Sequence, residues 1–192
     1  MPKWLEQAAK NDLEILEDGQ CQLCGSDTLH GITECVATAG KITHKISQEK
    51  GIQHMTIFLC VDAHALQHTL IHGRWNNHFH LTRLHLILRH QVQWTYDLTT
   101  VLNEVLDAYK LKHADERIVD PDQAHRSTIT VIDVDASHDE DEYVRLVWQW
   151  AEQVYTSFAD SHPIAQSLAE LFLQKCEAIS KDSQQTADEE SE

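Results

Sequence analysis

Few residues in this sequence interrupt a helix. Its 192 residues include only three prolines and six glycines, and apolar side chains recur every three or four positions along most of the chain. This spacing places the apolar side chains on one face of an α-helix. Because the expected helices are joined by short connections, the sequence predicts an all-α fold, a helical bundle without an internal repeat.

The apolar pattern also predicts where the helices lie. Helices are expected over residues 4–18, 36–50, 52–72, 76–94, 98–109, 143–158 and 163–180, and a loop is expected over residues 113–127. The β-branched segment from Thr128 to Val134 has two interpretations, a short strand or a turn into a helix. We favour the turn, because Thr130 and Asp133 have the spacing of a capping box.

The last twelve residues differ in composition from the rest of the chain. Residues 181–192 hold five acidic residues, one lysine and almost nothing apolar. A segment with so little to bury gains too little from folding to offset its lost conformational entropy. We therefore expect one helical domain over residues 1–180 and a disordered acidic tail over residues 181–192.

The charge of the chain restricts its partners. There are 31 acidic residues against 15 basic ones, for a net charge of -16. Such a charge repels phosphate, which argues against nonspecific binding to nucleic acid or to an anionic membrane. No apolar run approaches the roughly 18 residues of a membrane span, and the first residues turn acidic too soon for a signal peptide. These features predict a soluble, cytoplasmic protein.

A pair of cysteines predicts a metal site near the N-terminus. Cys21 and Cys24 are separated by two residues, so both thiols can bind one zinc ion from a tight turn. Gly25 follows and lets backbone amides approach the sulfurs without a clash with Cβ. Two alternatives remain, a pair of free thiols beside a turn and a redox dithiol. Thioredoxin-like chemistry needs a βαβ context, and none is visible around this pair.

Tetrahedral zinc needs two further ligands, and several residues are candidates. His30 and Cys35 follow at distances typical of a zinc knuckle, whereas His68 and His85 would approach from helices. By contrast, Cys60 and Cys176 lie in apolar helical stretches and are expected to be small buried hydrophobic residues.

The third expected helix carries a row of histidines. His64, His68 and His72 follow at intervals of four, which puts their rings on one face, where they could share a metal or form a solvated polar stripe. Asp62 is predicted to face the core, where a carboxylate needs a partner. It would orient a metal-bound histidine or pair with an arginine or lysine.

At these residues the chain resembles an uncharacterised bacterial family of small zinc-ribbon-like helical proteins, a domain of unknown function. The family pattern Cys-x-x-Cys-Gly, followed by a histidine and a third cysteine, corresponds to Cys21, Cys24, Gly25, His30 and Cys35. Its motif Val-Asp-Ala-Tyr-Ala-x-Gln-His corresponds to residues 61–68, and a His-Leu pair corresponds to residues 85–86.

The resemblance covers about residues 20–170 and implies three further site residues, Cys35, His68 and His85, but no reaction. The sequence departs from the family motif in three places. His64 stands where the family has tyrosine, Val36 where it has an aromatic residue, and Thr69 where proline is expected.

Two functions are compatible with these residues. The first is a noncatalytic protein in which zinc ties the N-terminal turn to the helical core and an acidic surface meets another protein. The second is a metal-dependent hydrolase or transferase, resembling DinB-like proteins, with a metal held by His64, His68 and His85 and with Asp62 as base or orienting group. An enzyme would keep an open coordination position, whereas a structural site is closed by four ligands.

Overall fold

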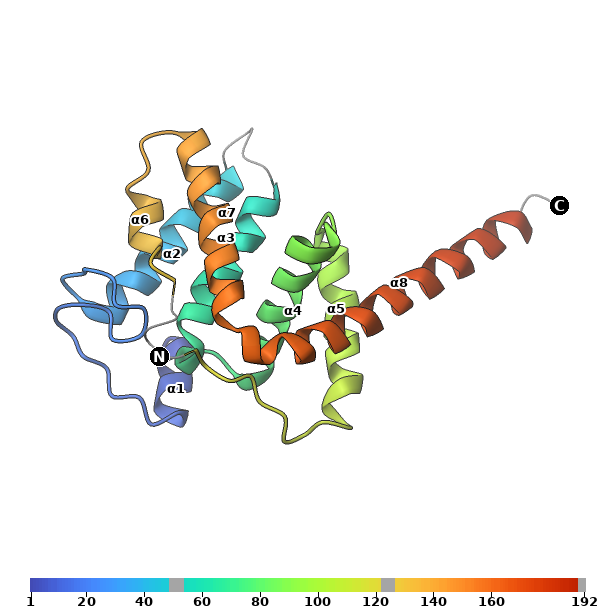
Figure 1. The fold of residues 1–192 in the computed structure, drawn as a ribbon, viewed down its shortest axis with the longest axis horizontal. Coiled ribbons are helices and arrows are strands. Elements are labelled where there is room, and N and C mark those ends of the chain that lie inside the picture. The colour runs from blue at the N-terminus through green and yellow to red at the C-terminus, as the bar shows by residue number, and fades with distance from the viewer. Residues whose placement is uncertain (49–53, 122–126, 190–192) are drawn as a thin grey trace.

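The computed structural model describes residues 1–48, 54–121 and 127–189 (Figure 1). Within these ranges the chain is all-α, without a β-strand. The helices are α1 (Lys3–Lys10), α2 (Gly31–Gln48), α3 (His54–Gln67), α4 (Arg74–His90), α5 (Tyr96–Lys110), α6 (Val131–Asp135), α7 (Glu140–Ser157) and α8 (His162–Glu189), with 3-10 turns η1 (Thr69–Ile71) and η3 (Ala159–Ser161).

Helices α3 and α4 connect the two sides of the molecule. On one side α3 packs against α2 and α7, with α6 between α2 and α7. On the other side α4 packs against α5, α7 and α8, as Figure 1 shows. The short α1 lies against η1, the turn between α3 and α4. None of the helices in the described ranges has both the length and the apolar character that a bilayer span requires.

Large aromatic side chains fill the core between these helices. Trp94 stacks on Phe172, with ring centres 5.4 Å apart, and joins the end of α4 to α8. Trp150, Tyr155 and Phe158 from the α7 region are each exposed by 2% or less. Burial of such rings removes a large apolar area from water and is the main stabilising contribution of this core.

The capping signals of the sequence start two helices. Thr130 and Asp133 form the predicted capping box, with the Thr130 amide donating to the Asp133 carboxylate at 2.7 Å, so the turn into α6 is confirmed. Asp139 accepts from the amide of Glu142 at 2.8 Å and begins α7. Both side chains satisfy amides that have no partner inside the helix.

Several helix boundaries differ from the sequence expectations; α2 begins at Gly31 instead of residue 36, and α4 ends at His90 instead of residue 94. The first helix ends at Lys10 instead of near residue 18, because Asp12 adopts a φ of 54° that a helix cannot contain. The third ends at Gln67 instead of residue 72, and η1 follows it. His72 is therefore not part of a helical row with His64 and His68.

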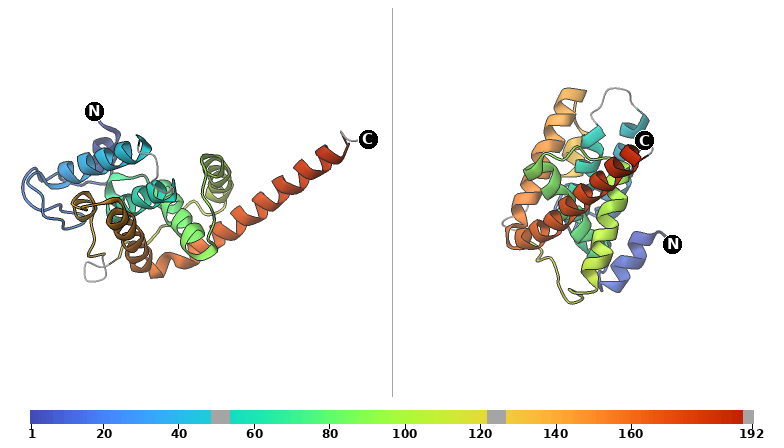
Figure 2. Two further views of the ribbon diagram at one scale, coloured as in Figure 1. Left: turned by 90° about the horizontal axis from the view of Figure 1, so that it is seen from above. Right: turned by 90° about the vertical axis from the view of Figure 1, so that its right-hand side faces the viewer.

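The end of the chain also differs from expectation. The structure continues α8 through Glu189, where the sequence predicted a disordered tail from residue 181. Figure 2 shows this part of α8 projecting from the body. Its glutamine, alanine and lysine residues favour helix, and a helix already nucleated in the core extends at little cost. The described side chains of this part, Lys181, Asp182 and Gln184, are exposed.

A buried ion pair links α3 to α4. The Asp62 carboxylate is fully buried and accepts three bonds from Arg83, at 2.6, 2.8 and 3.1 Å, and one from His80 at 2.7 Å. Of the two roles considered for Asp62, orienting a metal-bound histidine or pairing with an arginine or lysine, the structure shows the pair with an arginine. The guanidinium also lies over the rings of Phe58, Phe79 and Trp94.

Removing the Asp62 side chain tests how much this pair stabilises the fold. Asp62→Ala should lower the free energy of unfolding by about 3–5 kcal/mol, because Arg83 would stay buried without its carboxylate. Asp107→Ala breaks the exposed pair with Lys110 and should cost about 0–1 kcal/mol. Urea denaturation of both variants measures the difference, and equal effects would contradict a stabilising buried pair.

Truncation after Ser180 tests the contribution of the projecting helix end. Exposed side chains contribute little to stability, so the melting temperature should change by no more than about 2 °C. Calorimetry of the full and shortened chains measures this, and a loss of several degrees would show that the segment packs on the body.

Candidate metal centre

Three thiols and one imidazole lie together near the N-terminus. The ligand atoms of Cys21, Cys24, Cys35 and His68 are all within 4.8 Å of one another. The Cys21 Sγ lies 3.4 Å from the His68 Nε2, and the Cys24 Sγ lies 3.7 Å from the Cys35 Sγ. Cys24 is half-buried and the other three residues are buried. This Cys3His cluster could hold a metal ion.

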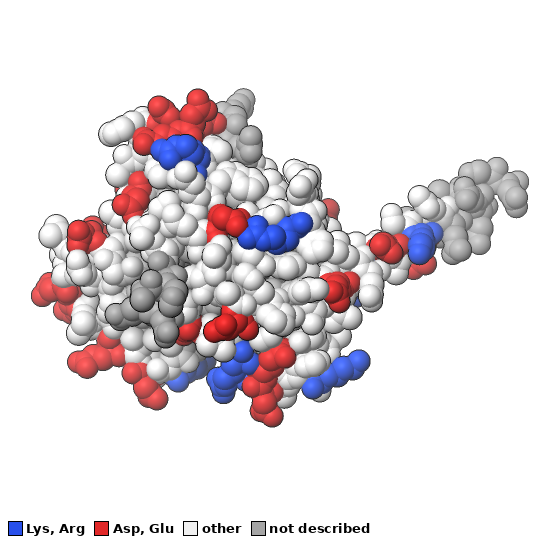
Figure 3. All heavy atoms as spheres, in the orientation of Figure 1, with Lys and Arg blue, Asp and Glu red and all other residues white. Residues whose placement is uncertain are grey.

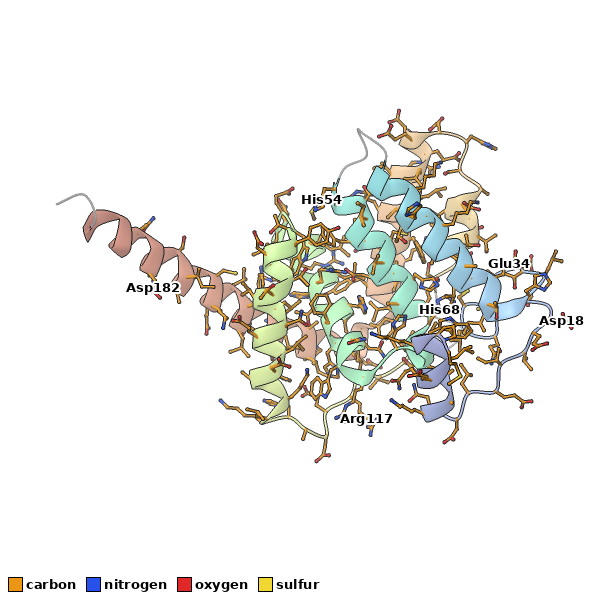
Figure 4. The ribbon with its side chains drawn as sticks, turned by 180° about the vertical axis from the view of Figure 1, so that it is seen from behind. Asp18, Glu34, His54, His68, Arg117 and Asp182 are labelled. Atoms are coloured by element: carbon orange, nitrogen blue, oxygen red, sulfur yellow. The ribbon has the colours of Figure 1, made fainter. Side chains whose placement is uncertain are left out.

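The four residues come from three separate parts of the chain. Cys21 and Cys24 lie on the loop before α2, and Cys35 lies near the start of α2. His68 follows directly after α3, and Figure 4 shows it at the end of that helix, beside α1. The cluster therefore joins the N-terminal loop, α2 and α3 at one point.

Backbone hydrogen bonds hold the cysteine loop in a closed form. The Gly19 amide donates to the Leu29 carbonyl at 3.2 Å, and the Gly31 amide donates back to Gly19 at 3.1 Å. Inside this closure, the Cys21 amide donates to the Ser26 carbonyl at 3.0 Å. The chain between Gly19 and Gly31 thus forms a compact loop that brings both thiols to the same side.

Gly25 has a conformational role in this loop. Its φ is 77°, a left-handed value that glycine adopts without strain, and its amide donates to the Cys21 carbonyl at 2.7 Å. From the sequence, we expected glycine here because it avoids a clash with Cβ. No atom lies within 4 Å of the place where that Cβ would stand, so the requirement comes from φ.

His68 is oriented by its second ring nitrogen. Its Nδ1 lies 2.8 Å from the His64 carbonyl oxygen, an acceptor, so Nδ1 carries the proton. Nε2 then faces the sulfurs. The ring is fully buried and stacks on His64 with centres 4.2 Å apart. A ligand imidazole commonly donates its other N–H to a carbonyl in this way.

The packed thiols and imidazole perturb one another. Hydrogen bonds from Cys24 and Cys35 lower the pKa of Cys21, whereas hydrogen bonds to Cys21 and Cys24 raise the pKa of Cys35. Burial lowers the pKa of His68, but bonds to the thiols outweigh it and raise that pKa to about 10. Without a cation, the group can hold only part of its negative charge, and a metal ion would allow all three thiols to ionise.

The family of the chain follows from a comparison of its sequence with family models. A model described as a family of unknown function (DUF5946) matches residues 19–159. The chain belongs to this family. The matched region begins just before Cys21, contains the whole Cys3His cluster, and leaves out α1 and all of α8. No curated protein and no solved structure matches the chain.

The structure brings together four of the five residues selected from the sequence, Cys21, Cys24, Cys35 and His68. The fifth, His85, lies within the same DUF5946 region but outside the cluster. Its Nδ1 is 2.7 Å from the Tyr155 hydroxyl, and its Nε2 is 3.3 Å from the Nε2 of His90.

The other histidine candidates take different places. His30, the alternative ligand of a local knuckle, is exposed and outside the cluster. His64 is 8% exposed and packs against His68 without joining the ligand group. His72 lies after η1, with its ring centre 5.8 Å from that of His80.

Ser26 is part of the cluster's surroundings and was not selected from the sequence. Its hydroxyl lies 3.2 Å from the Cys24 sulfur and 3.0 Å from the Cys35 sulfur. A hydroxyl there can donate to a thiolate and stabilise its charge. In the sequence, its position as a small polar residue two places after the second thiol, inside the turn, could have identified it.

Substitution of single cysteines tests which thiols hold metal. Cys24→Ser should reduce the metal content of the folded protein to well below that of the unmodified chain. Cys60→Ala and Cys176→Ala should retain it, because both residues lie outside the cluster. Elemental analysis of the purified variants measures metal per chain. Loss of metal in either alanine variant, with the fold intact by circular dichroism, would contradict this assignment.

Proposed function

We propose that this protein is a noncatalytic zinc-binding protein whose metal fastens the N-terminal loop to the helical body. The observation that carries the proposal is the convergence of three sulfurs and one imidazole nitrogen from three chain segments. Sites of this composition, with three thiolates and one histidine, are typical of structural zinc.

The separations within the cluster support zinc as the ion. Zinc–sulfur bonds of about 2.3 Å and zinc–nitrogen bonds of about 2.0–2.1 Å at tetrahedral angles separate two sulfurs by about 3.8 Å and a sulfur from a nitrogen by about 3.6 Å. The corresponding distances are 3.7 Å for Cys24 and Cys35 and 3.4 Å for Cys21 and His68. These two pairs of ligand atoms therefore already have the separations that zinc requires.

An ion at this position would stabilise the fold by closing a long loop. Cys21 and His68 are 47 positions apart in sequence. In the unfolded chain, the entropic cost of closing a loop of this length is about 3 kcal/mol, apart from a constant that depends on the stiffness of the chain. When binding requires the folded arrangement, the free energy of binding adds to the stability of the fold.

The catalytic alternative loses its residues in this arrangement. It needs His64, His68 and His85 around one ion, and among the described residues only His68 contributes to the ligand group. Its candidate base, Asp62, is held by Arg83 inside the core. Four protein ligands also leave no open position for a water molecule or substrate, which supports the structural role.

The surface supports a protein as the partner in this proposal. Figure 3 shows acidic side chains spread over the visible face, with a group at the start of α7. That group includes Asp139, Glu140 and Asp141, which are exposed. A basic patch on another protein would complement this charge, whereas nucleic acid and anionic lipid would be repelled.

Zinc content and melting temperature of histidine variants test the shared site. The unmodified chain should hold about one zinc ion, with three sulfur ligands and one nitrogen ligand by X-ray absorption at the zinc edge. His68→Ala should lose much of that zinc and lower the melting temperature by roughly 6–12 °C. This range follows from a loss of about 3 kcal/mol in the free energy of unfolding, because each kcal/mol shifts the melting temperature by about 2–4 °C in a chain of this size.

Two other histidines are the matched controls for this experiment. His72→Ala and His30→Ala should keep both zinc content and melting temperature, because neither ring belongs to the cluster. Full zinc and unmodified stability in His68→Ala would sink the shared-site proposal. A zinc loss in His30→Ala instead would assign the metal to a local knuckle of Cys21, Cys24, His30 and Cys35.

A further inference from the structure

A second pair of ligand-type side chains lies at the far end of α4. His85 and His90 place their Nε2 atoms 3.3 Å apart, with ring centres separated by 5.2 Å. His90 is the last residue of α4, and Gln91 follows in the left-handed conformation that ends the helix. Neither imidazole belongs to the Cys3His cluster.

The geometry of the pair is that of two imidazoles sharing an ion. Zinc–nitrogen bonds of about 2.0–2.1 Å at a tetrahedral angle place two imidazole nitrogens about 3.3 Å apart and their ring centres about 5.2 Å apart. In a linear hydrogen bond with the same distance between the two nitrogens, the rings would point straight at each other. Their centres would then be about 5.6 Å apart. The observed separation of the ring centres, 5.2 Å, agrees with the shared ion.

His85 is held ready for this role by the residues around it. Its ring is 8% exposed, and its Nδ1 lies 2.7 Å from the Tyr155 hydroxyl. Tyr155 is itself held in place by two neighbours. The His162 ring stacks on the Tyr155 ring, with centres 4.1 Å apart, and the Arg89 guanidinium lies 4.5 Å from the centre of the Tyr155 ring. With Nδ1–H donating to the hydroxyl oxygen, Nε2 keeps the lone pair that a metal needs.

The charge next to the pair and its access to solvent both bear on a bound cation. The nearby Arg89 is paired with Glu152, which offsets its positive charge. His90 is exposed, so an ion can reach the pair from solvent.

We propose that His85 and His90 form a second metal site, distinct from the cysteine cluster, that binds one divalent late transition-metal ion through their Nε2 atoms. Neutral imidazoles without thiolates suit ions such as Ni²⁺, Cu²⁺ and Zn²⁺ and bind Mg²⁺ and Ca²⁺ poorly. Two protein ligands leave the remaining positions to water, so this ion exchanges with solvent, unlike one enclosed by four ligands.

Nickel binding to the zinc-loaded, full-length protein tests the proposal. Calorimetric titration with Ni²⁺ should find one site, and His90→Ala should weaken it at least about tenfold, because one of two protein ligands is lost. Tyr155→Phe should also weaken it roughly 10- to 100-fold, as loss of an outer hydrogen-bond partner does at other sites. His138→Ala, which removes an exposed histidine elsewhere, is the matched control and should bind nickel like the unmodified chain.

X-ray absorption at the nickel and zinc edges distinguishes this site from the cysteine cluster. The nickel edge should show nitrogen and oxygen ligands only, while the zinc edge keeps its own ligands. Nickel affinity that is equal in the unmodified chain and in His90→Ala would overturn the proposal and leave a hydrogen-bonded pair only. Sulfur around nickel would overturn it as well. Neither result bears on whether zinc occupies the cluster, which the zinc edge reports separately.

Discussion

Helix α3 is enclosed by α2, α4 and α7, so a charged side chain on its buried faces needs a partner inside the protein. The Asp62 carboxylate meets Arg83, which places α4 against α3 in one register. At the C-terminal end of the helix, the Nδ1 of His68 donates to the His64 carbonyl, and Nε2 faces Cys21. The position of the N-terminal loop and that of α4 thus both depend on polar groups that α3 cannot expose to water.

The helical periodicity was sufficient to predict an all-α fold but not where α3 ends. The apolar pattern continues through Ile71, which is buried, so the pattern alone predicts a longer helix. The break depends on partners distant in sequence: Asn11 donates to the Leu70 carbonyl at 2.7 Å, and Asn77 donates to the Thr69 carbonyl at 3.1 Å. Side chains that satisfy the backbone of a turn from another element leave no periodic signal in the turn itself.

The candidate site was partly visible in the sequence for a similar reason. Cys21 and Cys24 form a local motif, so their proximity needs no knowledge of the fold. The choice between His30 and His68 does need it, since spacing favours His30, whereas only the return of α3 to the loop brings His68 close. His85 lies in an apolar stripe, and sequence does not distinguish a ligand from a residue that meets Tyr155, 70 positions away.

The turn between α3 and α4 separates the two histidine-containing groups. His68 lies at this turn, and because α4 runs back along α3, His85 and His90 lie at the opposite end of the pair of helices. Between them stands the Asp62–Arg83 pair, enclosed by aromatic rings. This pair joins α3 to α4 without any metal, so the helical core has its own stabilising contacts. An ion at the cluster would act on the N-terminal loop, which has few apolar residues to hold it, and an ion at His85 and His90 would act on the end of α4.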